Sequence, residues 1–339
     1  MKCSYRIAEV RPYICWPYFY HAWGVAGIRG GGSPEGLSAL TAEREKLWAD
    51  AQRMLDELEE RVQTQALFVL HEAYGEGDDI VLVKDNRELA RLPMLRQQSS
   101  AAPQLCLADF LYPRGKAQAD SQLPKGKAPT GSLLPKGEAP TGSLLPKGEA
   151  PTGSPLPSKM PTGSQLPKGK MPADSAFCHL GLFAATVSST FVDEATDDYR
   201  RMLAQTLADR LAEATAEALH EQVRRTYWGY APHERLSVDE LHREAFQGIR
   251  PAVGYPSLPD MSLNFLLDDL LDMQQVGIRL TESGMMCPHA SVSGLMFAHP
   301  KARYFDVGRI GDDQLADYAR RRGLPADDLR RFLRIADAC

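Results

Sequence analysis

The chain has 339 residues, 43% of them apolar, with 39 basic and 44 acidic side chains and a formal net charge of −5. This length suits one large or two small domains of ordinary globular composition, and without a clustered basic excess there is no reason to expect nucleic-acid binding. The longest apolar stretch, residues 13–28, is interrupted by Pro17, His21 and two glycines, so no bilayer span of about 20 apolar residues is expected.

The N-terminal segment and the cysteines favour a cytoplasmic protein. Residues 1–11 contain no signal-peptide hydrophobic region. The six cysteines are dispersed without a Cys-x-x-Cys pair, whereas a secreted disulfide framework would be denser and a zinc site would show paired spacing. The eight histidines show no metal-ligand spacing either, and no Gly-x-Ser-x-Gly motif or Cys/His pair is identifiable. We therefore predict no metal site and assign no catalytic residue.

Glycines cluster over residues 27–36, a composition that also occurs in phosphate-binding loops. The cluster lacks the Lys-Ser/Thr pair of such a loop, and no strand precedes it. We predict a flexible surface turn.

The N-terminal half predicts one helix and a hairpin. Apolar residues at helical spacing predict a helix over residues 41–62, with Thr41 as its N-cap. Residues 66–70 and 80–83 predict two strands around a Gly- and Asp-rich turn at residues 75–79.

An 11-residue repeat begins at Leu123 and reads LPKGKAPTGSL, LPKGEAPTGSL and LPKGEAPTGSP, followed by two degenerate copies. Each copy has too little apolar surface to offset roughly 1–2 kcal/mol per residue of backbone ordering, and its prolines exclude a helix or central strand. We predict that residues 114–175 are a disordered insertion in a single domain formed by residues 1–113 and 176–339. A tether or a peptide-binding target is the alternative for this insertion.

The strongest helical pattern covers residues 198–225, where one apolar stripe is predicted to face the core. The stripe consists of Met202, Leu203, Leu207, Leu211, Ala214, Ala218, Leu219 and Val223. Ser237 opens a further helix, because Glu240 three residues later completes a capping box.

The C-terminal part predicts two strands, at residues 291–297 and 303–307, and two short helices, at residues 312–322 and 325–336. Strands and helices do not alternate regularly along the chain, and this favours an α+β fold over a βαβ arrangement.

Residues 250–256, RPAVGYP, form the most unusual local segment. The prolines bias Arg250 and Tyr255 towards extended conformations, and Gly254 can take a positive φ. Such a segment exposes backbone polar groups beside an aromatic ring and a guanidinium, which binds carboxylates bidentately. This combination suits a ligand with a carboxylate and a planar base. A structural turn is the commoner interpretation of such a segment taken alone.

Several segments, in order, together resemble one family. They are residues 95–98 (LRQQ), 106–110 (CLADF), 197–199 (DDY), 208–214 (ADRLAEA), 227–232 (YWGYAP), 247–256 (QGIRPAVGYP), 280–283 (LTES), 290–294 (ASVSG) and 299–300 (HP). The chain closely resembles the C-terminal S-adenosylmethionine-binding activation domain of cobalamin-dependent methionine synthase, over almost its whole length outside the insertion.

The resemblance implies a C-shaped α+β domain whose central twisted antiparallel sheet is flanked by helices. It also implies binding of S-adenosylmethionine and methyl transfer to the cobalamin of a partner protein, for which flavodoxin or an equivalent reductant supplies an electron. The chain has no homocysteine zinc site, folate barrel or cobalamin-ligating motif. We therefore expect a freestanding methyltransferase component that acts in trans on a separately encoded synthase and is not itself a complete synthase.

The resemblance also implies the site residues. Arg250 falls where the family arginine holds the ligand carboxylate. The same resemblance implies the residues that line the ligand and those that match acidic positions around the cleft. The lining residues are Ala252, Gly254, Tyr255, Tyr304 and Phe305. At the last two of these positions the family has a Tyr-Tyr pair. The acidic residues are Asp209, Glu213 and Glu244. Solvated helix faces are the alternative for these acids.

Two positions depart from the family pattern. Cys15 stands where the family has an aspartate that pairs with the ligand ammonium, and Met261 stands where the family has a histidine. Loss of a charge-assisted hydrogen bond of about 1.5–3 kcal/mol predicts an affinity lower by roughly tenfold to a hundredfold. Two alternatives follow: a corrinoid-protein docking module with a degraded S-adenosylmethionine site, or a reactivase of another corrinoid methyltransferase.

Overall fold

A six-stranded antiparallel sheet forms the centre of the computed structural model, which describes residues 1–25, 34–98, 103–114 and 178–334. The strands run in the order β4-β3-β2-β5-β8, and β1 also pairs with β2. Their bounds are β1 Lys2–Arg6, β2 Gln63–Glu76, β3 Asp79–Lys84, β4 Arg87–Pro93, β5 Cys178–Val187 and β8 Ser291–Met296. The long strand β2 organises the sheet: β5 covers one of its edges, while β1 and β3 share the other.

The predicted hairpin is confirmed as β2 and β3, joined at Gly77 and Asp78. Gly77 has φ 60°, a conformation that a tight turn requires and glycine adopts without cost. Both strands extend beyond the prediction, because backbone pairing continues past the apolar runs into half-exposed polar residues such as Glu72.

Helices cover both faces of the sheet, and successive residues of β5 show why. Phe183 and Ala185 point into one apolar core, which also contains the buried stripe of α5 Asp198–Gln222. Leu182 and Ala184 point into a second core, shared with α7 Leu263–Leu271. Because side chains alternate along a strand, a strand buried on both faces reads as a nearly continuous apolar run.

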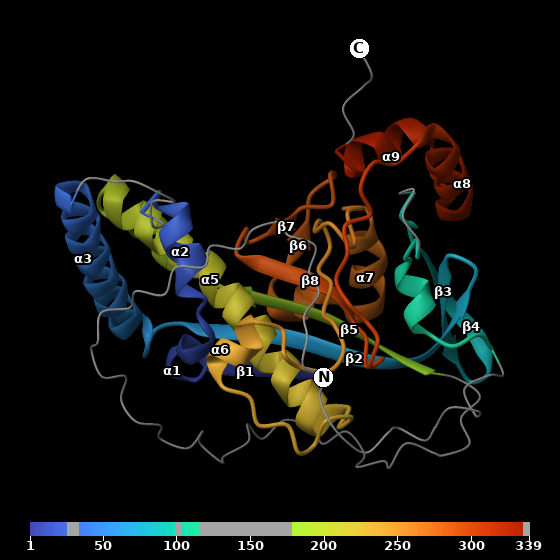
Figure 1. Cartoon of the computed structure of the whole chain (residues 1–339), viewed down its shortest axis with the longest axis horizontal. Coiled ribbons are helices and arrows are strands. Elements are labelled where there is room, and N and C mark those ends of the chain that lie inside the picture. The colour runs from blue at the N-terminus through green and yellow to red at the C-terminus, as the bar shows by residue number, and fades with distance from the viewer. Residues whose placement is uncertain (26–33, 99–102, 115–177, 335–339) are drawn as a thin grey trace.

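The remaining helices lie towards the two ends of the sheet (Figure 1). Helices α2 Trp16–Ala22 and α3 Pro34–Leu58 lie at one end, and α8 Asp312–Arg322 and α9 Ala326–Phe332 lie at the other. The shorter elements are α1 Ile7–Val10, α4 Thr190–Asp193, α6 Val238–His242, β6 Arg279–Leu280 and β7 Met286–Cys287. The predicted α+β class, with a central antiparallel sheet flanked by helices, is confirmed.

Most predicted helices are present, with three corrections. The prediction of Thr41 as an N-cap is wrong, because α3 begins at Pro34, and proline suits the first helical position. Met202 does not join the buried stripe of α5: it is 47% exposed, whereas the adjacent Leu203 is buried. Helix α9 ends at Phe332, before the predicted residue 336, whereas the capping box of Ser237 is confirmed.

The predicted strand at residues 303–307 is wrong, since this segment is extended but belongs to no sheet. The edge of β8 that it would need is already occupied by residues 249–253. The backbone of the segment is bonded instead to single groups: the Val307 N–H donates to the Pro256 carbonyl at 3.0 Å, and the Phe305 N–H donates to Ser257 Oγ at 3.0 Å.

Two predictions lie outside the described residues. One is the disorder of the repeat insertion, apart from residue 114, and the other is the glycine-rich turn as far as residue 33. For residues 34–36 the predicted turn is wrong, because they form the start of α3. Across the described ranges, no helix is both long and apolar enough to cross a bilayer.

Candidate functional site

The proline-bracketed segment lies along the outer edge of β8. Ile249 and Phe297 exchange two backbone hydrogen bonds of 2.9 and 3.0 Å, and the Leu295 N–H donates to the Pro251 carbonyl at 3.0 Å. Gly294 makes this close approach possible, because a Cβ at that position would lie 2.2 Å from the Pro251 oxygen. The sheet edge therefore fixes the direction in which Arg250 and its neighbours point.

Alternation along this edge separates the side chains. Ile249 and Val253 contribute to the core on the α7 face, whereas Ala252 is buried in the core on the α5 face. Arg250 shares the α5 side with Ala252, and its guanidinium carbon lies 5.9 Å from the ring centroid of Phe183. The candidate binding residue thus faces α5.

A tight turn ends the segment. Gly254 has φ 88°, as predicted, and its N–H donates to the Leu258 carbonyl at 2.8 Å. A Cβ on Gly254 would lie 2.7 Å from the Met261 sulfur. Both the conformation and the packing therefore require glycine here, and the Met261 thioether packs against the turn.

Arg250 is held by carboxylates of α5. Its Nη2 lies 2.9 Å from Oε2 of Glu217, and both side chains are only 12% exposed. Its Nη1 lies 4.0 Å from Oε2 of Glu213. The Tyr255 hydroxyl donates to the other oxygen of Glu213 at 2.7 Å. Glu213 therefore joins the arginine to the aromatic ring that follows the turn.

The predicted aromatic pair also reaches this segment. The Arg250 backbone N–H donates to the Tyr304 hydroxyl at 2.8 Å, and burial raises the pKa of Tyr304 to about 12. Phe305 makes a different contact: its ring centroid lies 6.4 Å from that of Phe110, and its backbone is hydrogen-bonded to the Ser257 hydroxyl. The Tyr304 side chain therefore contacts the segment that carries Arg250. The Phe305 backbone holds the turn that follows this segment, through Ser257.

Cys15 and Glu244 lie within electrostatic reach of the same groups. Burial raises the pKa of the Cys15 thiol, and among nearby charges Arg210 lowers it while Glu217 raises it. Burial also raises the pKa of Glu244, with a further increase from Glu217 and an opposing effect of Arg250. A raised thiol pKa keeps Cys15 neutral, so it supplies no negative charge.

Asp209 has a separate contact, since its Oδ1 lies 3.3 Å from Nδ1 of the exposed His289. Glu217, which the sequence analysis missed, pairs most closely with Arg250. Its position could have been found from the spacing, because residues four apart lie on one face of a helix and Glu213 had been identified.

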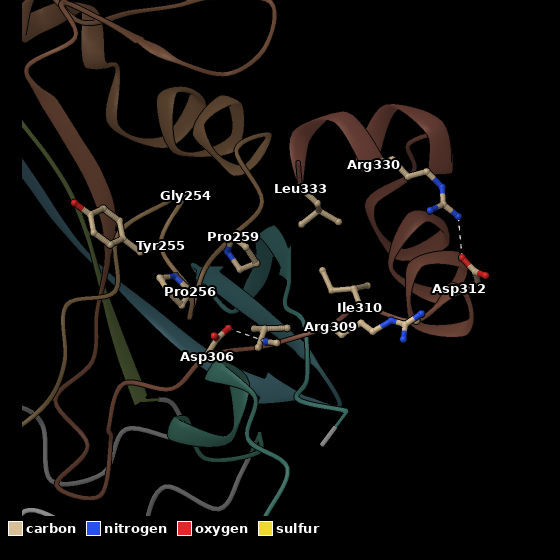
Figure 2. Close-up of a pocket in the computed structure, with 13 residues that line it drawn as sticks. Gly254, Tyr255, Pro256, Pro259, Asp306, Arg309, Ile310, Asp312, Arg330 and Leu333 are labelled. Carbon is tan, nitrogen blue, oxygen red and sulfur yellow. Dashed lines mark hydrogen bonds and ion pairs between the residues drawn. The ribbon is translucent and has the colours of Figure 1, made fainter. Parts of the chain in front are cut away.

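A cavity of about 590 Å³ adjoins the turn on another side (Figure 2). It lies between residues 254–256, residues 306–312 and the C-terminal helix residues Arg330 and Leu333. Figure 2 shows the ring of Tyr255 turned away from Arg330 and Leu333, in agreement with its hydrogen bond to Glu213. The turn therefore lies between the region around Arg250 and this cavity.

Comparisons with known proteins agree on one family. The model of the vitamin B12 dependent methionine synthase activation domain matches residues 6–122 and 171–323, which is more than half of the chain. The structure is similar to the crystal structure of the MetH reactivation domain bound to AdoHcy, with a TM-score of 0.73 and 31% sequence identity. This match covers 98% of the present chain and 89% of the other.

Proposed function

Because the chain belongs to the family of vitamin B12 dependent methionine synthase activation domains, we propose that it binds S-adenosylmethionine. Its role is to supply the methyl group for reductive methylation of cob(II)alamin in a separately encoded methionine synthase. A similar domain has been crystallised with AdoHcy, the demethylated form of this methyl donor.

The observation that carries the proposal is the setting of Arg250. Its guanidinium is oriented by Glu217, its backbone N–H is bonded to Tyr304, and the Gly254 turn follows four residues later. Its Nε is buried and has no hydrogen-bond partner among the described residues. Since an unpaired buried donor is costly, this atom favours a ligand group that accepts hydrogen bonds, such as the carboxylate of the methionine part.

The surrounding groups suit the rest of the ligand. Backbone at Ala252 and the turn at Gly254 lie beside the arginine, with the ring of Tyr255 next in sequence. These groups line the adenosine and methionine portions, while Glu213 and Glu244 provide negative charge opposite the ammonium and sulfonium.

The chain's contribution to the reaction is positioning. S-adenosylmethionine carries its methyl group on a positively charged sulfur that is already a good leaving group, so the transfer needs no general base from this chain. Residues on a sheet edge hold the donor in one orientation, and such orientation can lower a barrier by several kcal/mol.

The partners follow from the same proposal. Cobalamin is carried by the cobalamin-binding part of the synthase, and flavodoxin or an equivalent reductant supplies the electron. A reconstitution assay tests this assignment: purified chain, oxidised synthase without its own activation domain, reductant and S-adenosylmethionine should restore methionine formation. Failure with the synthase but success with another corrinoid methyltransferase would favour the alternative reactivase.

Binding itself is tested by calorimetry on the intact chain. Replacing Arg250 with alanine should weaken binding of S-adenosylmethionine about tenfold or more, because a charge-assisted contact to the carboxylate is lost. Arg200→Ala is the control, since Arg200 of α5 forms an exposed ion pair with Glu57 of α3, and this variant should bind as the wild type does. No heat of binding at millimolar ligand with the unmodified chain would overturn the proposal.

The second candidate, a docking module with a degraded site, is favoured by one observation, the half-buried, neutral thiol of Cys15. Its signature would be retention of the corrinoid partner by a chain that does not bind S-adenosylmethionine. The calorimetric measurement above separates the two candidates.

A further inference from the structure

Glu217 and Arg250 form the most enclosed ion pair of the candidate site. Their charged atoms are 2.9 Å apart, and each side chain is 12% exposed. Surface ion pairs contribute little, but a pair removed from water must be compensated by further contacts. The compensation is incomplete among the described residues.

Two atoms of this pair lack partners. Oε1 of Glu217 and Nε of Arg250 are buried, and neither has a hydrogen-bond partner among the described residues. One is an acceptor on a carboxylate and the other a donor on a guanidinium. An amino-acid zwitterion offers the complementary groups, an ammonium for the first and a carboxylate for the second.

Glu217 is also central to the charges of the site. Its carboxylate acts on Arg250, Glu244, Tyr304 and Cys15. The neighbourhood contains three carboxylates, Glu213, Glu217 and Glu244, and two guanidiniums, Arg210 and Arg250. With the thiol of Cys15 neutral, this set carries more negative than positive charge.

Such a balance favours a ligand with a net positive charge. S-adenosylmethionine carries a carboxylate, an ammonium and a sulfonium, which sum to +1, whereas its demethylated product has lost the sulfonium charge. Negative charge along one wall of the site therefore stabilises the methyl donor more than the product, most strongly at Glu217, whose side chain is 12% exposed.

We propose that Glu217 is a specificity-determining residue of this site: it fixes Arg250 for the ligand carboxylate and supplies the negative charge that favours the methyl donor over its neutral thioether product. This inference rests on the proposed function. The inference adds a preference for S-adenosylmethionine over its demethylated product. The proposed function does not require this preference, because a site could bind the two ligands equally well.

The test is the isosteric variant Glu217→Gln, examined by calorimetry with S-adenosylmethionine and with S-adenosylhomocysteine. The amide oxygen can still accept from Arg250, so the variant removes charge and largely keeps shape. Both ligands carry the ammonium, so both should bind more weakly, but binding of the methyl donor should weaken at least about threefold more than binding of the product, because only the donor also loses the attraction on its sulfonium.

Glu221→Gln is the matched control, because Glu221 is a largely buried carboxylate one turn further along α5 that pairs with Arg225 and Tyr13. It should leave the ratio of the two affinities unchanged. If Glu217→Gln weakened both ligands equally, the ratio of their affinities would be unaltered. This result would overturn the inference that Glu217 determines specificity.

A second variant tests whether the charge of Glu217 is what matters. Cys15→Asp adds a carboxylate within electrostatic reach of the same site and so replaces the negative charge that Glu217→Gln removes. In the Glu217→Gln background it should recover most of the lost affinity. No recovery in that background would overturn the inference, whereas absence of binding of either ligand to the wild-type chain would instead overturn the proposed function.

Discussion

At the scale of single residues, Gly294 shows how one missing Cβ creates the candidate site. Residues 249–253 approach β8 so closely that an added Cβ would lie 2.2 Å from the Pro251 oxygen and 2.8 Å from the Ala252 Cα. Both neighbours are backbone atoms, which cannot rotate away. The path of the segment that carries Arg250 therefore depends on glycine at a position opposite it.

Replacing Gly294 with alanine should consequently displace this segment. We expect a loss of about 1–3 kcal/mol in the free energy of unfolding, as for other overpacked sites, together with weaker binding of S-adenosylmethionine. Urea unfolding and calorimetry on the same preparation measure the two effects. Wild-type values for both would show that the backbone adjusts without cost to the site.

At the scale of elements, helix α5 combines an apolar stripe with a buried polar row. Glu213 and Glu217 reach the candidate site, and further along, His220 of α5 and Arg224 of the π-helical turn that continues it are fully buried. Arg224 pairs with Glu234 at 2.8 Å and lies 4.3 Å from the ring centroid of Phe246. Charged groups thus lie on the side of the helix that faces the rest of the fold, where they contact the sheet-edge segment and Phe246.

His220 makes the stability of this element dependent on pH. Burial, together with the charges of Arg224 and Arg250, lowers its pKa well below the usual 6.5, and its other close neighbours are the Tyr230 hydroxyl and the Phe246 ring. The folded state holds the ring neutral while the unfolded state binds a proton below pH 6.5. His220 should therefore cost stability progressively as the pH falls below that value.

The expected size of this effect is up to about 1.4 kcal/mol per pH unit below 6.5. Measuring the free energy of unfolding of wild type and His220→Gln at about pH 7.5 and about pH 5.5, one unit either side of 6.5, isolates this effect. The difference between the two proteins should shift in favour of the variant as the pH is lowered. A difference that is independent of pH would contradict this assignment.

At the scale of the whole molecule, the C-terminal helices form a small third core fastened to the rest by polar contacts. Its apolar residues include Leu315, Tyr318 and Leu329, with Leu95 and Val307 from elsewhere in the chain. The Tyr318 hydroxyl donates to the buried Asp260 at 2.7 Å, and Arg322 lies 3.3 Å from the same carboxylate. One aspartate therefore connects the turn below Gly254 to these helices and to one wall of the cavity.

Removing this connection should loosen the C-terminal helices before the sheet. Asp260→Ala leaves Arg322 unpaired in a buried position, a change that costs roughly 3–5 kcal/mol. Hydrogen exchange should accelerate in α8 and α9 and remain slow in β2 and β5. Asp328→Ala, which breaks an exposed pair with Arg331, is the control and should have little effect. Uniform acceleration across the sheet would contradict a separable C-terminal unit.

Local patterns in the sequence predicted much of the fold. The stripe of α5, the capping box of α6, the β2–β3 hairpin and the bounds of α8 all follow from side-chain periodicity or turn chemistry within a few residues. The extended path and positive φ at Gly254 follow in the same way from local proline and glycine constraints. The resemblance to the family rested on short motifs, and the comparisons confirm it.

Other features depended on competition between distant segments. Residues 303–307 have a strand-like pattern, but residues 249–253 occupy the sheet edge they would need. Glu217 carries no motif, and its pairing with Arg250 appears only when α5 crosses the sheet. Propensity and periodicity act over a few residues and are determined by the sequence itself, whereas edge pairing and the partners of buried charges depend on which segments meet in space, and so only the tertiary structure decided them.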